Sequence, residues 1–132
     1  MERIMIIDSD LLQMKLLKDD LAGQYLTLGC SRGTKAMDLF NIYQPSALIL
    51  DPETFDLNTR EFVGKIRRLP YRKHIPILAL TKMTTLRHIE KSFDLGVDMI
   101  FSKPCAPERI KKKLSQYFVI PAVVPDMEMS GV

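Results

Sequence analysis

The chain has 132 residues, of which 46% are hydrophobic and 27% charged, so it is long enough for one folded domain and too apolar for a disordered protein. No apolar run approaches the roughly 20 residues that span a bilayer, and the apolar run near Met1 is too short for a signal peptide, so we expect a cytoplasmic protein that does not bind membranes. The net charge of +3 is uneven, because residues 1–66 carry −3 and residues 67–132 carry +6.

Two basic clusters carry the excess in the second half, Arg67-Arg68 with Arg72-Lys73 and Lys111-Lys112-Lys113. Few aromatic residues lie near them, and the chain after Phe118 is too short for a helix-turn-helix unit. We therefore interpret them as solvated helix ends and loops and expect no direct nucleic-acid binding. Cys30 and Cys105 lack metal-type spacing, which predicts ordinary reduced thiols.

Five short apolar runs predict β-strands, because each is too short for a helix and none alternates strictly between polar and apolar residues. They are residues 3–7, 25–28, 47–50, 75–80 and 99–101. Continuous apolar character is typical of strands that are buried on both faces of a parallel sheet. The second run is the weakest of the five and is the natural candidate for an edge strand.

A helical pattern follows each of these runs. The first helix is expected after a cap at Asp8 or Ser9, with a stop near Gly23 and an inward face that comprises Leu12, Leu16, Leu17 and Leu21. The second spans residues 34–43 and ends before Pro45. The third begins after Asn58 or Thr59, and the fourth spans residues 86–95, between a cap at Thr84 or Thr85 and a stop at Gly96. The fifth begins at Pro107, with Ile110, Leu114 and Phe118 on one face.

This alternation predicts an α/β fold, a doubly wound parallel sheet with right-handed crossovers and helices on both faces. In such a sheet the loops at the carboxyl ends of the strands form the functional site. Asp8 follows the first strand, Asp51 the third and Thr81 the fourth, and the fifth leads into Lys103. Oxygen ligands suit Mg²⁺, a carboxylate can attack a phosphoryl donor, and a lysine offsets the charge of the transferred group. We therefore expect phosphoryl-transfer chemistry at this edge.

These four residues, with Lys103-Pro104 and Gly96-Val97-Asp98, resemble the response-regulator receiver (CheY-like) domain of bacterial two-component signalling. The resemblance covers about residues 2–118, so we divide the chain into a receiver domain, residues 1–118, and a C-terminal tail or linker, residues 119–132. It implies a flavodoxin-like (βα)5 receiver fold with strand order 2-1-3-4-5.

The resemblance also implies roles for individual residues. Asp51 would accept a phosphoryl group from a histidine kinase or phosphotransfer protein. Asp8, Asp51 and the backbone carbonyl of Glu53 would hold Mg²⁺, Thr81 would be the switch hydroxyl, and Lys103 would pair with the phosphoryl group. The Lys103-Pro104 bond would be cis. Self-phosphorylation and autodephosphorylation would be the only enzymatic activities.

The acidic pocket is degenerate relative to the family pattern. Ser9 stands where the family has a second acid, and Asp10, one position later, would reach the metal only through a water. Phe55 and Thr59 replace a proline and a glycine in the loop after Asp51, and Pro52 follows Asp51 directly. Ile100 replaces the aromatic switch residue, since Phe101 is one position late. These departures favour an alternative function, a pseudo-receiver that binds partners independently of phosphorylation.

The family's output surface corresponds here to residues 84–95, 99–101 and 107–118. We expect a downstream protein to bind there, and the same surface leaves homodimerisation open. A metabolic enzyme or nucleotide binder is disfavoured, because the sequence contains neither the glycine-rich dinucleotide motif nor a P-loop.

Overall fold

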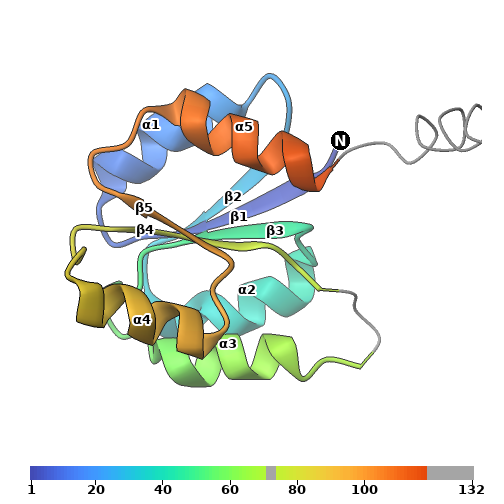
Figure 1. Ribbon diagram of the computed structural model, residues 1–132. Coiled ribbons are helices and arrows are strands. Elements are labelled where there is room, and N and C mark those ends of the chain that lie inside the picture. Colours follow the sequence, from blue (N-terminus) through green and yellow to red (C-terminus); the bar gives the residue numbers. More distant parts are fainter. Residues whose placement is uncertain (71–73, 119–132) are drawn as a thin grey trace, which may run out of the picture.

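Five parallel strands form one sheet in a computed structural model that describes residues 1–70 and 74–118 (Figure 1). The strand order is β2-β1-β3-β4-β5, which confirms the predicted flavodoxin-like α/β fold. The strands are β1 (Arg3–Ile7), β2 (Leu26–Cys30), β3 (Ala47–Leu50), β4 (Ile77–Thr81) and β5 (Met99–Ser102). The expected tail, residues 119–132, and the basic pair Arg72-Lys73 lie outside the described residues.

Five α-helices connect and follow the strands. They are α1 (Leu11–Leu21), α2 (Ala36–Tyr43, preceded by a 3-10 turn, Gly33–Lys35), α3 (Thr59–Arg67), α4 (Leu86–Leu95) and α5 (Pro107–Tyr117). Figure 1 shows α1 and α5 on one face of the sheet and α2, α3 and α4 on the other. Each face of the sheet therefore has its own layer of helices, as predicted for a doubly wound fold.

The three central strands are apolar on both faces because both faces are covered. Ile4 and Ile6 of β1 pack into the cluster that includes α1 and α5, whereas Met5 and Ile7 pack into the cluster that includes α2 and α3. Each residue of β3 and β4 is likewise buried. This explains the continuous apolar runs in the sequence.

Two strand boundaries differ from the prediction. The fourth strand begins at Ile77, because Pro76 has no N–H to donate to the ladder. The second strand runs from Leu26 to Cys30 and passes through Gly29, although glycine usually weakens a strand. Glycine leaves room there for the Met14 side chain of α1, since an added Cβ would collide with the Met14 sulfur unless that side chain moved.

The first helix differs from the prediction at its cap and on its inward face. Asp10, rather than Asp8 or Ser9, is the N-cap, and its carboxylate accepts from the Gln13 N–H at 3.0 Å. Leu12 and Leu16 are 68% and 52% exposed, so their predicted inward position is wrong. The buried side chains are Met14, Leu17 and Leu21. The expected caps at Asn58 and Thr85 and the expected stop at Gly96, where φ is 107°, are confirmed.

Candidate functional site

Asp8 lies at the carboxyl end of β1 and is almost completely buried. Its Oδ1 accepts from the Asp10 N–H at 2.9 Å, and its Oδ2 accepts from the Lys103 ammonium at 2.8 Å. Its own N–H donates to the Cys30 carbonyl at 3.0 Å, which continues the β1–β2 ladder. Both carboxylate oxygens of Asp8 therefore have a partner, as a buried charge requires.

Asp51 occupies the corresponding position after β3. Its N–H donates to the Ile7 carbonyl at 2.8 Å, and its Oδ1 accepts from the Glu53 N–H at 2.8 Å. Its Oδ2 accepts from the Lys103 ammonium at 2.6 Å. Its side chain is 13% exposed, against 6% for Asp8, so Asp51 is the more accessible of the two carboxylates.

Lys103 joins the two carboxylates from the end of β5. Its side chain is only 6% exposed, and the Lys103-Pro104 bond is cis, as the resemblance implies. Burial lowers the pKa of Lys103, but the hydrogen bonds and charges of Asp51 and Asp8 outweigh burial and raise that pKa above its usual value. Lys103 is therefore a cation bound directly to Asp51, the carboxylate expected to react.

Thr81 ends β4 and lies beside this cluster, and none of its described contacts is with Asp51. Its side chain is buried, and its Oγ1 accepts from the Met83 N–H at 3.0 Å, so its O–H hydrogen is available to donate. The residue lines a small pocket of about 150 Å³ together with Pro52, Glu53, His88 and Lys91, among others. Thr81 therefore faces the space between the loop after Asp51 and α4.

Ser9 and Asp10 have other partners in this structure. The Ser9 hydroxyl oxygen accepts from the Phe55 N–H at 2.6 Å, which joins the β1–α1 loop to the β3–α3 loop. The Asp10 carboxylate caps α1. The serine that replaces the family's second acid thus holds together the two loops that carry Asp8 and Asp51.

Two threonines shape the loop after Asp51. The sequence did not single out Thr54, and it pointed to Thr59 only as a possible helix cap and as a replacement for the family's glycine. The buried Thr54 donates its hydroxyl hydrogen bond to the Asp51 carbonyl at 2.7 Å, and Thr59 donates to the Pro52 carbonyl at 2.9 Å. Threonine hydroxyls that bond nearby carbonyls are common in turns, so two threonines shortly after a strand-end aspartate were the available signal. Together these bonds hold the backbone that directly follows the Asp51 side chain.

The two carboxylates of this site are few for a metal site but sufficient for Mg²⁺. No cluster of three or more His, Cys, Asp and Glu side chains with metal-binding geometry occurs within residues 1–70 and 74–118. Mg²⁺ is nevertheless held in many sites by one or two carboxylates, with water and phosphate oxygens completing its shell. Asp8 and Asp51 meet that requirement, because a carboxylate accepts about four hydrogen bonds and each here accepts two.

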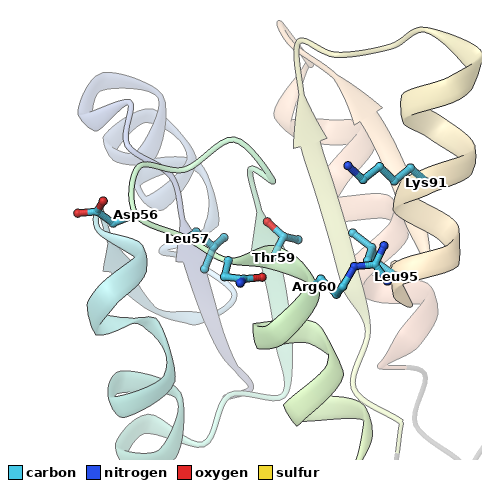
Figure 2. Close-up of a pocket in the computed structure, with 7 residues that line it drawn as sticks. Asp56, Leu57, Thr59, Arg60, Lys91 and Leu95 are labelled. Atoms are coloured by element: carbon cyan, nitrogen blue, oxygen red, sulfur yellow. The ribbon is translucent and has the colours of Figure 1, made fainter.

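A larger groove lies between α3 and α4 and shares Thr59, Lys91 and Leu95 with the pocket beside Thr81. Its volume is about 750 Å³, and its lining includes Arg60 of α3 with Lys91 and Leu95 of α4 (Figure 2). No side chain of α4 is fully buried, so this helix does not fill the space beneath it. The helix next to Thr81 is therefore the one that packs least tightly against the sheet.

The two candidate switch residues of β5 point to opposite faces of the sheet. Ile100 is half-buried and packs with the cluster on the side of α2 and α3, whereas Phe101 is buried in the cluster on the side of α1 and α5. The phenyl ring is therefore on the wrong face to replace the aromatic residue that Ile100 displaces.

Within the described part of the chain, none of the helices has the length and apolar character that a membrane span requires.

A family model for the response regulator receiver domain matches residues 4–115, which is most of the chain. The chain belongs to the response regulator receiver family. It is a receiver domain of the kind that serves two-component phosphorelays. Receiver domains are signalling modules rather than metabolic enzymes, and they work with histidine kinases or phosphotransfer proteins and with downstream partners. They typically bind Mg²⁺ at an acidic pocket.

The similar proteins are receivers of varied function. The polar-differentiation response regulator DivK of Brucella anthropi is 25% identical over 115 residues, which cover 86% of this chain and 94% of DivK. A two-component response regulator from Clostridium difficile has a TM-score of 0.80 at 20% identity, over 88% of this chain and 94% of that one. The chemotaxis response regulator CheY4 of Vibrio cholerae has a TM-score of 0.78 at 22% identity, over 88% of this chain and 98% of that one. These two structures establish the fold.

Proposed function

We propose that this receiver accepts a phosphoryl group on Asp51 and transmits the change to a partner protein. The observation that carries the proposal is the contact of the Lys103 ammonium with both Asp51 and Asp8. A lysine bound to a partly exposed carboxylate, beside a second, buried carboxylate, is suited to phosphoryl transfer.

In the proposed reaction, an oxygen of Asp51 attacks the phosphorus of a phosphohistidine. The new P–O bond forms as the P–N bond breaks, and the histidine nitrogen leaves with the bonding electrons. Lys103 stays close to the transferred group and offsets its negative charge. Hydrolysis would return Asp51 when water attacks the phosphorus, releasing inorganic phosphate.

The proposed metal ligands are Asp8, Asp51 and the Glu53 carbonyl. Bound Mg²⁺ would supply further positive charge to the phosphoryl oxygens. The carboxylate of Asp8 would hold the ion beside Asp51, and the backbone hydrogen bond from Glu53 to Asp51 keeps the Glu53 carbonyl in the same loop. The Asp10 carboxylate caps α1, and its water-mediated contact with the metal stays a prediction.

The cytoplasmic location of the protein also stays a prediction.

The proposed switch begins at Thr81. Its available O–H hydrogen would donate to a phosphoryl oxygen on Asp51 and draw the β4–α4 loop toward the site. Because α4 has no fully buried side chain, a displacement of this loop would shift α4 at little cost in buried apolar area. The face of α4, β5 and α5 would then bind a downstream protein or a second copy of the chain.

The alternative, a pseudo-receiver that ignores phosphorylation, is not favoured by the comparisons. Despite the departures at Ser9 and Ile100, the Lys103 ammonium contacts both Asp51 and Asp8. We therefore place the effect of these departures on metal affinity and signal output rather than on the ability of Asp51 to react.

The test is incubation of the protein with Mg²⁺ and acetyl phosphate, followed by intact-mass spectrometry. We expect the wild type to gain the mass of one phosphoryl group and Asp51→Asn to gain none. Asp56→Asn, which changes an exposed aspartate of the same loop, is the matched control and should react like the wild type. A wild type that stays unmodified, or an Asp51→Asn variant that is modified, would contradict the proposal.

A further inference from the structure

A shallow groove runs between α5 and the edge strand β5, on the side of the sheet that α1 and α5 cover and α4 does not. Its volume is about 380 Å³, and it is lined by Met99, Phe101, Arg109, Lys112, Lys113 and Gln116. Met99 is half-buried, and Arg109 and Lys112 are exposed. The groove thus combines an apolar floor, supplied by the strand, with a basic rim, supplied by the helix.

The positive charge on this rim is not neutralised within the described part of the protein. None of Arg109, Lys112 and Lys113 forms a salt bridge with a described residue, although five other Lys and Arg side chains in the described part of the chain do. The acid nearest in sequence, Glu108, is exposed and unbridged among the described residues. Asp98, which precedes β5, is already paired with Arg67 and His74. The rim is therefore an uncompensated cluster of cations.

Aromatic rings hold part of this cluster in place. The Arg109 guanidinium lies 5.6 Å from the centre of the Phe101 ring, and the Lys113 ammonium lies 5.6 Å from that of Tyr117. Cations that are already positioned lose less side-chain entropy when they pair with an anion. The positioned cations therefore favour direct ion pairs with carboxylates and not only a diffuse electrostatic attraction.

The groove also borders a free sheet edge. Among residues 1–70 and 74–118, β5 pairs only with β4, so no strand in that part of the chain lies along its other side (Figure 1). Edge strands of this kind can accept an extended segment of another chain. A bound segment would gain backbone hydrogen bonds from β5, apolar contact from Met99 and ion pairs from the α5 cations.

We propose, building on the output role assigned above to the face of α4, β5 and α5, that this groove binds an acidic segment of a partner protein that carries at least one apolar side chain. The apolar side chain packs on Met99 beside Phe101, and flanking Asp or Glu side chains pair with Arg109, Lys112 and Lys113. The signal partner of this receiver is thereby defined by its chemistry, an acidic segment with an apolar anchor.

A protein segment fits the groove better than a nucleic acid or a membrane. Phe101 is only 6% exposed and is covered by Arg109, so its ring has no free face on which a base could stack. The cations line a concave groove with a half-buried methionine, which fits a single side chain rather than a flat lipid surface. Nucleic acid supplies phosphate charge but no aliphatic side chain for the floor.

The test uses two synthetic twelve-residue peptides of identical length, one of alternating Glu and Leu and one of alternating Lys and Leu. Binding is followed by NMR chemical-shift changes and fluorescence anisotropy, before and after treatment of the protein with acetyl phosphate. We expect the acidic peptide alone to bind, with shifts concentrated at Met99, Phe101 and residues 109–116. The affinity should weaken at least tenfold in Lys112→Glu/Lys113→Glu and should also fall as salt is raised.

Lys18→Glu/Lys111→Glu is the matched control, because it makes the same change in net charge at two lysines that do not line the groove. An equal loss in both double variants, shifts elsewhere on the surface, or tighter binding of duplex DNA or phosphatidylserine vesicles than of the acidic peptide would overturn the proposal. Intact-mass measurements on the same samples distinguish failure of the groove proposal from failure of the proposed phosphorylation of Asp51. Phosphorylated protein that fails to bind the acidic peptide contradicts the groove alone, whereas absence of phosphorylation contradicts the proposed function.

Discussion

At the scale of single residues, the charge of the pocket is set by three side chains and stays net negative. Asp8 and Asp51 contribute two negative charges, and Lys103 compensates one of them at 2.6 to 2.8 Å. The family's further acid is a serine here, and its hydroxyl is bonded to the backbone N–H of Phe55. Metal affinity rises with the number of carboxylates in a site, so Ser9 should be the main determinant of weak Mg²⁺ binding.

Ser9→Asp should tighten Mg²⁺ binding at least tenfold, equivalent to about 1.4 kcal/mol, because it adds a carboxylate next to Asp8. Isothermal titration calorimetry with MgCl₂ measures this directly. Asp10→Asn is the matched control: asparagine also caps helices, and the Asp10 carboxylate is already engaged by Gln13, so its affinity should match the wild type. Weaker binding in Asp10→Asn would instead support the water-mediated role, and no change in Ser9→Asp would contradict the role given to Ser9.

A second residue-scale prediction concerns alkaline pH. Burial raises the pKa of Tyr25 above its usual value of 10.0, and the charge of Glu2 adds to the shift. As the pH rises, the unfolded chain therefore loses the Tyr25 proton before the folded protein does. The contribution of the protonated tyrosine to the free energy of unfolding is fully present below about pH 10 and is lost as the pH rises above it. In urea unfolding between about pH 9 and pH 11, Tyr25→Phe should lose less stability than the wild type. Parallel pH profiles for the two proteins would contradict this assignment.

The strand-end residues Asp8, Asp51, Thr81 and Lys103 could be predicted because parallel strands bring their carboxyl ends to one edge. The bond between Ser9 and Phe55 could not, since it joins two irregular loops whose relative position depends on the finished fold. The same holds for the hydroxyl bond of Thr54 to Asp51. The sequence thus predicted that Asp8, Asp51 and Lys103 meet at one edge with Thr81 beside them, whereas the loop contacts that hold them needed the structure.

At the scale of elements, the order and type of the helices followed from the sequence, but the inward face of α1 did not. This helix contains so many leucines that several faces look apolar, and only packing against the sheet selects Met14, Leu17 and Leu21. The caps at Asn58 and Thr85 were predictable because their side chains bond within their own helix. Local signals thus fixed where α3 and α4 begin, whereas tertiary packing decided which face of α1 is buried.

The packing of α4 leads to a prediction about hydrogen exchange. Each of the other four α-helices has at least two fully buried side chains, and α4 has none. Opening α4 therefore exposes little apolar surface, and its amides should exchange fastest among the five α-helices. Hydrogen–deuterium exchange with mass spectrometry tests this ranking.

Cap variants provide the control for the exchange experiment. Thr85→Ala removes the cap bond to His88 and should destabilise α4 by about 1 kcal/mol, raising exchange there and leaving α3 unchanged. Asn58→Ala is the matched variant at the start of α3, where the three buried side chains should limit the increase. Exchange in α4 as slow as that in α3 would show that α4 is held by contacts other than apolar burial.

At the scale of the whole molecule, the sheet separates two apolar clusters, and the candidate site lies at the edge where the ends of β1, β3 and β5 meet. Asp8, Asp51 and Lys103 come from three strands that are distant in sequence, so the site exists only when the sheet is complete. Any ligand that binds this site must therefore stabilise the entire fold rather than one helix.

This linkage predicts that Mg²⁺ raises the thermal stability of the domain through the two carboxylates. At a Mg²⁺ concentration of about 100 times the dissociation constant, the expected gain is about 2.7 kcal/mol, which corresponds to a rise of several degrees in Tm. Differential scanning calorimetry with and without MgCl₂ measures the shift, and EDTA should reverse it. The shift should vanish in Asp8→Asn and persist in Asp56→Asn, whose exposed aspartate pairs with Arg32 instead. Because only the metal-dependent change is compared, a lower starting Tm in either variant does not affect the outcome. A shift in Asp8→Asn equal to that of the wild type would place the ion outside the pocket.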